Sequence, residues 1–370
     1  MYYIPLVLMI PFCIAELVMV DKKNIMFKVV FALLLVAACF RYGQGTDYFG
    51  YMYNFYMGDE HSEIGYRMIC QLIKLLGGGF ESLIFVVSVF QMLCIYRAIM
   101  LYSPYKVMSL LILYPTIYLT YFCSGLRQGI VAAFFLGFMV EWLLEHKWLS
   151  YIIACIILST IHSSSLILLV LLLVRELRIK ELYLCLAGAL MFGCFVYFTP
   201  TSFFSFIDIG SFQNQIQNIS ISYIGLIERI IMFIIITGVY RNFEMSNEHI
   251  DHIQILYKIY FAGFIISVAC FPWGLVSSRL PMVMKAVEVI LIPMLLKGNR
   301  MYRQVLVAFM VCYSLLMTTK NISTYIGQGE YTAYNVVTYP YLNIGDKDFA
   351  HQVRSRNKNL QLMIKDGVIQ

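Results

Sequence analysis

The sequence predicts an all-α, polytopic integral membrane protein. Hydrophobic residues make up 61% of the 370 residues and charged residues only 13%, about half of the roughly 25% that is usual in soluble domains. The mean hydropathy is +0.76, which excludes a soluble protein. The net charge of +6 does not indicate a nucleic-acid partner, because most basic residues lie in short loops between apolar runs, where they set the orientation of membrane helices.

About twelve transmembrane helices are expected, because apolar runs of about 20 residues, with some tolerance, can each cross the bilayer. The predicted spans are residues 4–20, 25–40, 80–102, 107–122, 128–144, two spans within 148–174, and then 182–198, 223–240, 255–271, 282–296 and 304–318.

Two segments have more than one interpretation. The segment 64–76 is short, carries Arg67 and Lys74 and is followed by three glycines, which favours an interfacial or re-entrant helix. Residues 148–174 would form a single helix about 40 Å long, which exceeds a hydrocarbon core of about 30 Å. The polar stretch from His162 to Ser165 therefore predicts a turn between two short helices.

We therefore expect that residues 64–76 do not cross the membrane and that residues 148–174 cross it twice. This topology agrees with the excess of Lys and Arg that cytoplasmic loops carry. Asp47, Arg127, His162 and Arg279 then share the external face. The basic residues that these choices place inside are Lys106, Lys147, Arg175, Arg178, Lys180, Arg241, Lys258, Lys297, Arg300 and Arg303.

The same topology predicts the division of the chain. One multi-span membrane domain covers residues 1–319, with external loops at 41–79 and 199–222, and a polar C-terminal tail covers 320–370. An even number of spans places the tail outside, whereas its basic residues favour the inside. The side of the tail therefore stays open.

Three arginines suggest an anion site at the external face. Arg127 begins a span after a Ser-Gly break, Arg279 directly precedes another span, and Arg41 begins the first external loop. Arginines at a membrane edge are costly and usually face protein, water or an anionic ligand. A guanidinium group offers a planar fork of donors that matches a phosphate group. We therefore hypothesise a diphosphate clamp at this face.

The same arginines have a second interpretation. Each could extend to lipid headgroups or pair with an acid such as Glu228 or Asp47. Gln128, which follows Arg127, and Arg229, which follows Glu228, are further candidates for substrate contacts.

Two residues compete as the catalytic base. His162 is flanked by hydroxyl side chains and could take a proton from a sugar hydroxyl near neutral pH, or it could be a hydrogen-bond donor between helices. Asp47 could serve instead, or it could form a turn beside Gly45. Tyr48 and the neighbouring tyrosines could stack on sugar rings or form the aromatic belt at the membrane interface.

No metal site is expected. Asp59, Glu60, His61 and Glu63 match no metal-ligand spacing and are interpreted as a solvated loop. The ten cysteines are scattered, mostly within apolar runs, where free cysteine behaves as a small hydrophobic residue. We therefore predict no disulfide bonds.

An ordered set of motifs resembles the EpsG family of Wzy-type polysaccharide polymerases. The set is GTDYFGYMYNFY with EIGYRMI, then SGLRQGIVAAFF, IHSSSLILL and SSRLPMVM, with TYPYLN near the C-terminus. These motifs occur in the family's order and extend over most of the chain from Arg41 to Pro281.

The resemblance implies a multi-pass glycosyltransferase of the bacterial inner membrane, with its active site facing the periplasm or exterior. A GT-C-like glycosyltransferase architecture is compatible with this fold class. It would join lipid-linked repeat units into O-antigen, capsule or exopolysaccharide. The implied partners are undecaprenyl-diphosphate-linked oligosaccharides and membrane lipids, with a chain-length regulator protein as a further candidate. No cofactor or required metal is implied.

Two other classes remain as alternatives. A lipid-linked oligosaccharide flippase would also be a basic protein with many spans, but its charges would be distributed through a central cavity. A secondary transporter would more often show an internal repeat and broken helices near the midplane of the membrane.

Overall fold

The computed structural model describes residues 2–18, 23–58, 62–199, 219–243, 250–298, 303–327 and 334–369. Within these ranges the chain forms one helical bundle without β-strands beyond two isolated bridges. The first half contains α1 Tyr3–Val18, α2 Ile25–Cys39, α3 Tyr48–Met57, α4 Ile64–Leu75, α5 Phe80–Tyr102, α6 Lys106–Leu113, the π-helix η1 Tyr114–Phe122, α7 Leu126–Phe134, the π-helix η2 Phe135–Met139, α8 Val140–Leu144, α9 Trp148–Ser159, the 3₁₀-helix η3 Ser163–Leu169 and α10 Val170–Glu176. The second half contains α11 Ile179–Phe198, α13 Tyr223–Arg241, α14 Ile250–Ala269, α15 Gly274–Arg279, α16 Met282–Lys285, α17 Glu288–Gly298, α18 Arg303–Gly327, the 3₁₀-helix η6 Ile344–Asp346, α19 Lys347–Val353 and α20 Lys358–Lys365.

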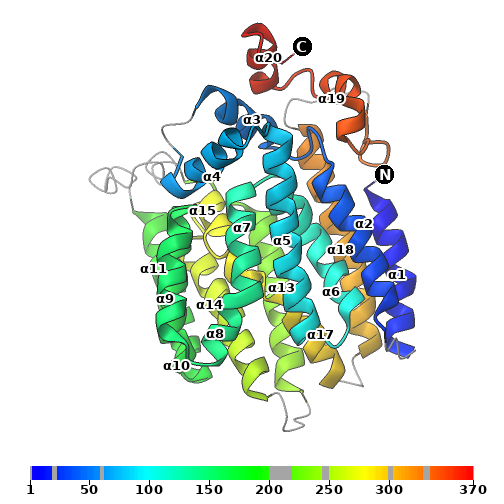
Figure 1. Ribbon diagram of the computed structural model, residues 1–370. Helices are drawn as coiled ribbons and strands as arrows, with labels where there is room; N and C mark the ends of the chain where they lie inside the picture. Colours follow the sequence, from blue (N-terminus) through cyan, green and yellow to red (C-terminus); the bar gives the residue numbers. More distant parts are fainter. Residues whose placement is uncertain are drawn as a thin grey trace.

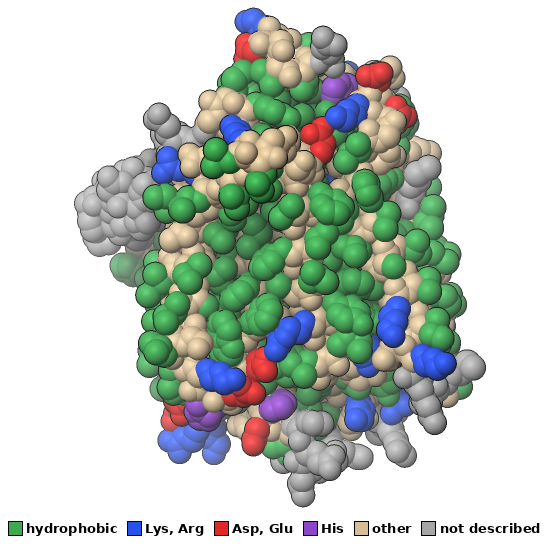
Figure 2. All heavy atoms as spheres, in the orientation of Figure 1, with side chains coloured by type: hydrophobic (Ala, Val, Ile, Leu, Met, Phe, Trp, Pro, Cys, Tyr) green, Lys and Arg blue, Asp and Glu red, His purple; other side chains and the backbone are tan. Residues whose placement is uncertain are grey.

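The bundle helices lie side by side, and α3, α4, α19 and α20 gather at one end of them (Figure 1). We call this end, which carries residues 41–47, the loop end. The opposite end, which carries the loops around Lys106, Lys147 and Arg178, is the basic end. Figure 2 shows a broad apolar band between the two ends, with charged side chains above and below it.

The predicted all-α polytopic fold is confirmed. In the described part of the chain, six helical segments are long and apolar enough to cross a membrane. Each remaining predicted span coincides with a shorter helix or with consecutive helical segments. The six long segments are Phe80–Tyr102, Leu126–Leu144, Ile179–Phe198, Tyr223–Arg241, Ile250–Ala269 and Arg303–Gly327.

The two ambiguous segments fold as the sequence predicts. Helix α9 ends at Ser159, the chain turns at Thr160–His162, and η3 packs back against α9. Helix α4 lies across the loop end with Tyr66 and Ile73 as its buried residues (Figure 1).

Basic residues from separate segments meet at the basic end. Lys258 Nζ donates to the carbonyl of Arg175 at 2.7 Å, and Arg241 Nη2 donates to the Tyr183 hydroxyl at 3.0 Å. These bonds join α14 to α10 and α13 to α11. Of the predicted external loop 199–222, only residues 199 and 219–222 lie within the described ranges.

The C-terminal tail lies at the loop end, on the same side of the bundle as residues 41–47 (Figure 1). The amide of Tyr42 donates to the carbonyl of Leu342 at 3.1 Å, and the amide of Ile344 donates to the carbonyl of Phe40 at 3.0 Å. Arg354 is fully buried and donates to the carbonyl of Gly45 at 2.9 Å. The tail is therefore tied to the loop by backbone and side-chain hydrogen bonds.

Gly45 allows this loop to approach the break between η1 and α7. Its φ is +90°, and a Cβ atom at this position would lie 2.5 Å from the carbonyl oxygen of Cys123. A side chain is excluded both by this contact and by the backbone conformation.

Arg41 is a structural residue and does not reach a cavity. It is 0% exposed and donates to the carbonyls of Ala38 and Phe122 and to Ser88 Oγ, at 2.5, 2.6 and 2.6 Å. We therefore correct the expectation that Arg41 contacts substrate. It holds the loop to α2, α5 and η1.

Tyr48 requires the same correction. It is 1% exposed, and its ring packs edge-on against Phe49 and Phe80 with centroids 5.3 and 5.2 Å apart. Its ring is enclosed by other aromatic rings and is not available to stack on a sugar.

Replacing Arg41 is expected to destabilise the fold. Arg41→Ala leaves buried acceptors without a donor and should lower the free energy of unfolding by about 3 kcal/mol. The measurement is the thermal unfolding midpoint of the purified protein in detergent. Arg67→Ala, at an exposed position on α4, is the matched control and should leave the midpoint unchanged. An Arg41→Ala protein as stable as this control would contradict the structural role.

Candidate functional site

A cavity of about 600 Å³ opens within the bundle towards the loop end. Its walls come from residues around 46–51, from η1 and the start of α7, and from α13, α15–α17 and α18. Six of the eight residues predicted as site candidates line it, namely Asp47, Arg127, Gln128, His162, Arg229 and Arg279. Arg41 and Tyr48 do not. The topology thus brings residues far apart in the sequence to one chamber.

The part of the cavity nearest the loop end contains a histidine held by two neighbours. His162 Nε2 lies 3.0 Å from the side-chain amide nitrogen of Gln128, and His162 Nδ1 lies 3.6 Å from Glu63 Oε1. An amide nitrogen can only donate, so Nε2 accepts and the proton of a neutral His162 is on Nδ1, facing Glu63. The basic lone pair of His162 therefore faces Gln128.

Glu63 joins three segments at this point. It forms an ion pair with Arg127, faces His162, and accepts a hydrogen bond from the amide of Ser163 at 3.2 Å. Burial alone would raise the pKa of Glu63, but the nearby His162, backbone donors and the charge of Arg127 lower this pKa to about 2. Glu63 is therefore ionised at neutral pH.

The position of Glu63 depends on a close approach by α4. The amide of Gly65 donates to the carbonyl of Thr160 at 2.7 Å, and a Cβ on Gly65 would lie 2.3 Å from Thr160 Oγ1. Only glycine allows α4 to meet the α9–η3 turn at this distance. The interpretation of Glu63 as a solvated loop residue is wrong, and Asp59, Glu60 and His61 lie outside the described residues.

Arg127 is held by charge and by aromatic rings. Besides its ion pair with Glu63, its guanidinium lies 5.7 Å from the ring centroids of both Tyr51 and Tyr66. Cation–π contacts of this kind add about 0.5–2 kcal/mol each. The arginine thus pairs with an acid, as the alternative interpretation allowed, but the acid is Glu63 rather than Glu228 or Asp47.

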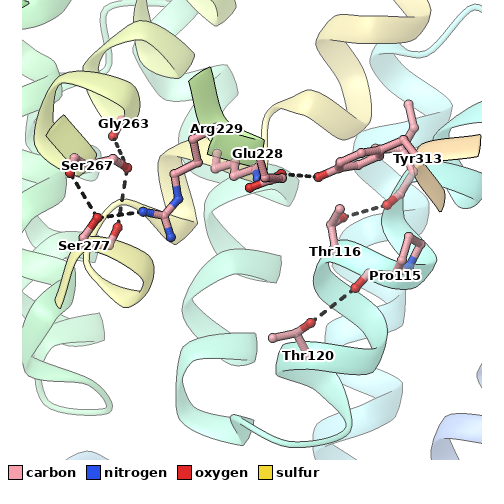
Figure 3. A network of polar contacts seen from close by, with 11 residues as sticks. Pro115, Thr116, Thr120, Glu228, Arg229, Gly263, Ser267, Ser277 and Tyr313 are labelled. Carbon is pink, nitrogen blue, oxygen red and sulfur yellow. Dashed lines mark hydrogen bonds and ion pairs between the residues drawn. The ribbon is translucent and has the colours of Figure 1, made fainter. Parts of the chain in front are cut away.

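The deeper part of the cavity contains a network of charged residues (Figure 3). Glu228 Oε1 accepts from Lys285 Nζ at 2.7 Å and from the Tyr313 hydroxyl at 2.6 Å. Arg229, the next residue of α13, extends the opposite way and donates to Ser277 Oγ at 2.6 Å (Figure 3). Glu228 and Arg229, which are adjacent on α13, therefore contact two different walls of the cavity.

Cations outnumber carboxylates around the cavity as a whole. The lining contains five cations and three carboxylates, namely Arg127, Arg229, Arg279, Lys285 and Lys320 against Asp47, Glu228 and Glu288. Charges within a membrane protein are expensive and usually mark a ligand or ion site. Our site prediction missed Lys285, Glu288 and Lys320, although isolated charges inside apolar runs are the sequence signal for such positions.

No metal-binding group is evident among the described residues, since they contain no cluster of three or more His, Cys, Asp or Glu side chains in suitable positions. The cysteines in those ranges are free thiols.

A comparison with protein families matches the EpsG family model to residues 24–341. The matched region includes both parts of the cavity. The chain belongs to the EpsG family. Membership supports a Wzy-like polysaccharide polymerase in general. Searches of curated proteins and of solved structures find no match.

The low pKa of Glu63 predicts a dependence of stability on pH. A carboxyl whose pKa is lower in the folded protein stabilises it above the unfolded pKa, and this contribution is lost as the pH falls through the folded value. The unfolding midpoint of the EpsG-family protein should therefore fall between pH about 4.5 and about 2. Glu63→Gln should reduce that fall.

The measurement compares midpoints at pH 7 and pH 3 for both proteins. Glu176→Gln is the matched control, because Glu176 also pairs with an arginine, Arg175, but is exposed at the basic end. An equal acid sensitivity in wild-type and Glu63→Gln proteins would refute the assigned ion pair.

Proposed function

We propose that this protein is a membrane glycosyltransferase that joins lipid-diphosphate-linked oligosaccharides into a surface polysaccharide. The loop end faces the exterior of the bacterial inner membrane. The observation that carries the proposal is a single cavity that combines an excess of cations with an oriented histidine. Membership of the EpsG family supports the same reaction class.

The cations fit the diphosphate of the lipid carrier. Arg229, Arg279, Lys285 and Lys320 supply donors and positive charge where Glu228 and Glu288 offset only part of it. The charge on the diphosphate increases as the bond to the sugar breaks, so cations placed there stabilise the transition state more than the ground state. Arg279 forms one side of this clamp, and Arg127, which is paired with Glu63, lines the same cavity.

His162 fits the role of general base, with Asp47 as the other candidate on the cavity wall. The acceptor hydroxyl would replace Gln128 at Nε2 and transfer its proton there as its oxygen forms a bond to the anomeric carbon. The bond between that carbon and the diphosphate breaks, and the lipid diphosphate leaves with the electron pair. The ionised Glu63 beside Nδ1 stabilises the imidazolium that forms.

Gln128 positions the ring before substrate arrives. Its amide nitrogen keeps the lone pair of His162 Nε2 directed into the cavity. Membrane lipids would surround the helices, and undecaprenyl-diphosphate-linked repeat units are the proposed substrates. A chain-length regulator is a proposed protein partner.

Loss of one clamp arginine should reduce polymerisation strongly. Arg279→Ala is expected to lower the rate by about 100-fold or more, the cost of removing one stabilising donor from a transition state. The measurement is polymer formation from lipid-linked repeat units by the purified protein. Arg178→Ala, an exposed arginine at the basic end, is the control. Normal polymer length in the Arg279→Ala protein at wild-type abundance would refute the clamp.

Deleting the gene distinguishes this reaction from transport. A cell without the polymerase should carry surface lipid with a single repeat unit, because units still cross the membrane but are not joined. The measurement is electrophoresis of the surface glycolipid, with a plasmid copy of the gene as control. Surface lipid without repeat units would indicate a flippase and contradict the proposal.

A further inference from the structure

A second cavity of about 620 Å³ adjoins the first one at the loop end. The two cavities share Thr46, Asp47, Tyr51 and Arg127 as a common wall. The second cavity is completed by Gly50 and Asn54 of α3 and by four tail residues, Arg356, Asn357, Lys358 and Asn359. It therefore lies between α3 and the C-terminal tail.

The tail segment is held in place by its own fold. The side chain of Asn357 caps α20 by accepting from the amides of Asn359 and Leu360 at 3.1 and 3.2 Å. Leu360 and Met363 are 0% exposed, and α20 packs against α3. The cavity wall is thus an ordered surface.

These tail residues lie beyond the region shared with the family. The family model matches residues 24–341, so the diphosphate site falls inside it and residues 356–359 fall outside it. A feature that is required for the common reaction would be expected within the matched region. The tail wall can therefore carry a property other than that common reaction.

The lining has the chemistry of a sugar site. Amide, hydroxyl and carboxylate groups from Asn54, Asn359, Thr46 and Asp47 can donate to or accept from sugar hydroxyls. Tyr51 adds an aromatic surface, and a few polar groups beside an aromatic ring are typical of small-ligand sites. Such a lining does not fit a lipid chain.

Charge separates this cavity from the diphosphate site. Arg127 is paired with Glu63, and Asp47 is the one carboxylate that lines this cavity together with Arg356 and Lys358. Within the described residues Arg356 and Lys358 take part in no ion pair. They can therefore bind hydroxyls or an acidic substituent of a sugar.

We propose that the second cavity binds the glycan of the acceptor repeat unit and that the tail selects which glycan is accepted. The inference rests on the proposed function, because it assigns the diphosphate of the growing chain to the first cavity. The shared wall then places the end of the acceptor glycan beside Asp47 and Arg127, at the entrance to the chamber that holds His162.

The test measures binding to the full-length protein in lipid nanodiscs. One probe is the free oligosaccharide repeat unit, prepared from the surface polysaccharide of the producing strain, and the other is inorganic diphosphate. The Arg356→Gln/Lys358→Gln pair should weaken oligosaccharide binding by about tenfold or more, which is about 1.4 kcal/mol. It should leave the affinity for diphosphate unchanged. Both side chains are exposed, so the two substitutions should leave the folding of the protein unchanged.

Matched controls separate this inference from the proposed function. Lys365→Gln, an exposed lysine on α20 outside the cavity, should change neither affinity. Arg279→Ala should lose diphosphate binding and keep oligosaccharide binding.

Three outcomes overturn the inference. They are unchanged oligosaccharide binding by the paired variant, loss of diphosphate binding alone in that variant, and no oligosaccharide binding by a wild-type protein that does bind diphosphate. If the wild-type protein binds the oligosaccharide through the tail but does not bind diphosphate, the proposed function fails and the glycan site stands.

Discussion

The carboxylate of Glu63 is the interaction on which the candidate site depends. It brings together the start of α4, the start of α7 and the α9–η3 turn by pairing with Arg127, facing His162 and accepting from the amide of Ser163. Charges removed from water need such partners, because an unpaired one would be strongly destabilising. The approach of Gly65 to Thr160 makes this contact possible, so the packing of α4 against the α9–η3 turn decides how His162 is oriented.

The deeper network shows a different use of charge. Lys285 and Tyr313 donate to Glu228, and Arg229 donates to Ser277, so these groups have partners in the absence of substrate, whereas Oε1 of the buried Glu288 has none among the described residues. The cations still outnumber the acids. A purely structural network would favour balanced charge, whereas an excess is stabilised only when an anion binds. This imbalance is the physical reason to connect the cavity with a diphosphate.

Two buried arginines hold the loop between the cavities. Arg41 donates to carbonyls on the membrane side, and Arg354 donates to Gly45 from the tail side. The loop residues Thr46 and Asp47 are thereby fixed as a wall between the two cavities. Support from both sides keeps Thr46 and Asp47 in a fixed position relative to both cavities.

The fold class, the helical spans, the turn at His162 and the grouping of Asp47, Arg127, His162 and Arg279, which line one cavity, could be predicted from the amino-acid sequence. Hydropathy, helix length and loop charge are local quantities, and a membrane converts them directly into topology. Tertiary structure alone decided that Arg41 and Tyr48 are buried supports, that Glu63 is the partner of Arg127, and that the tail lies at the loop end. These outcomes depend on which distant segments meet, and local composition does not record the partner of a charged side chain.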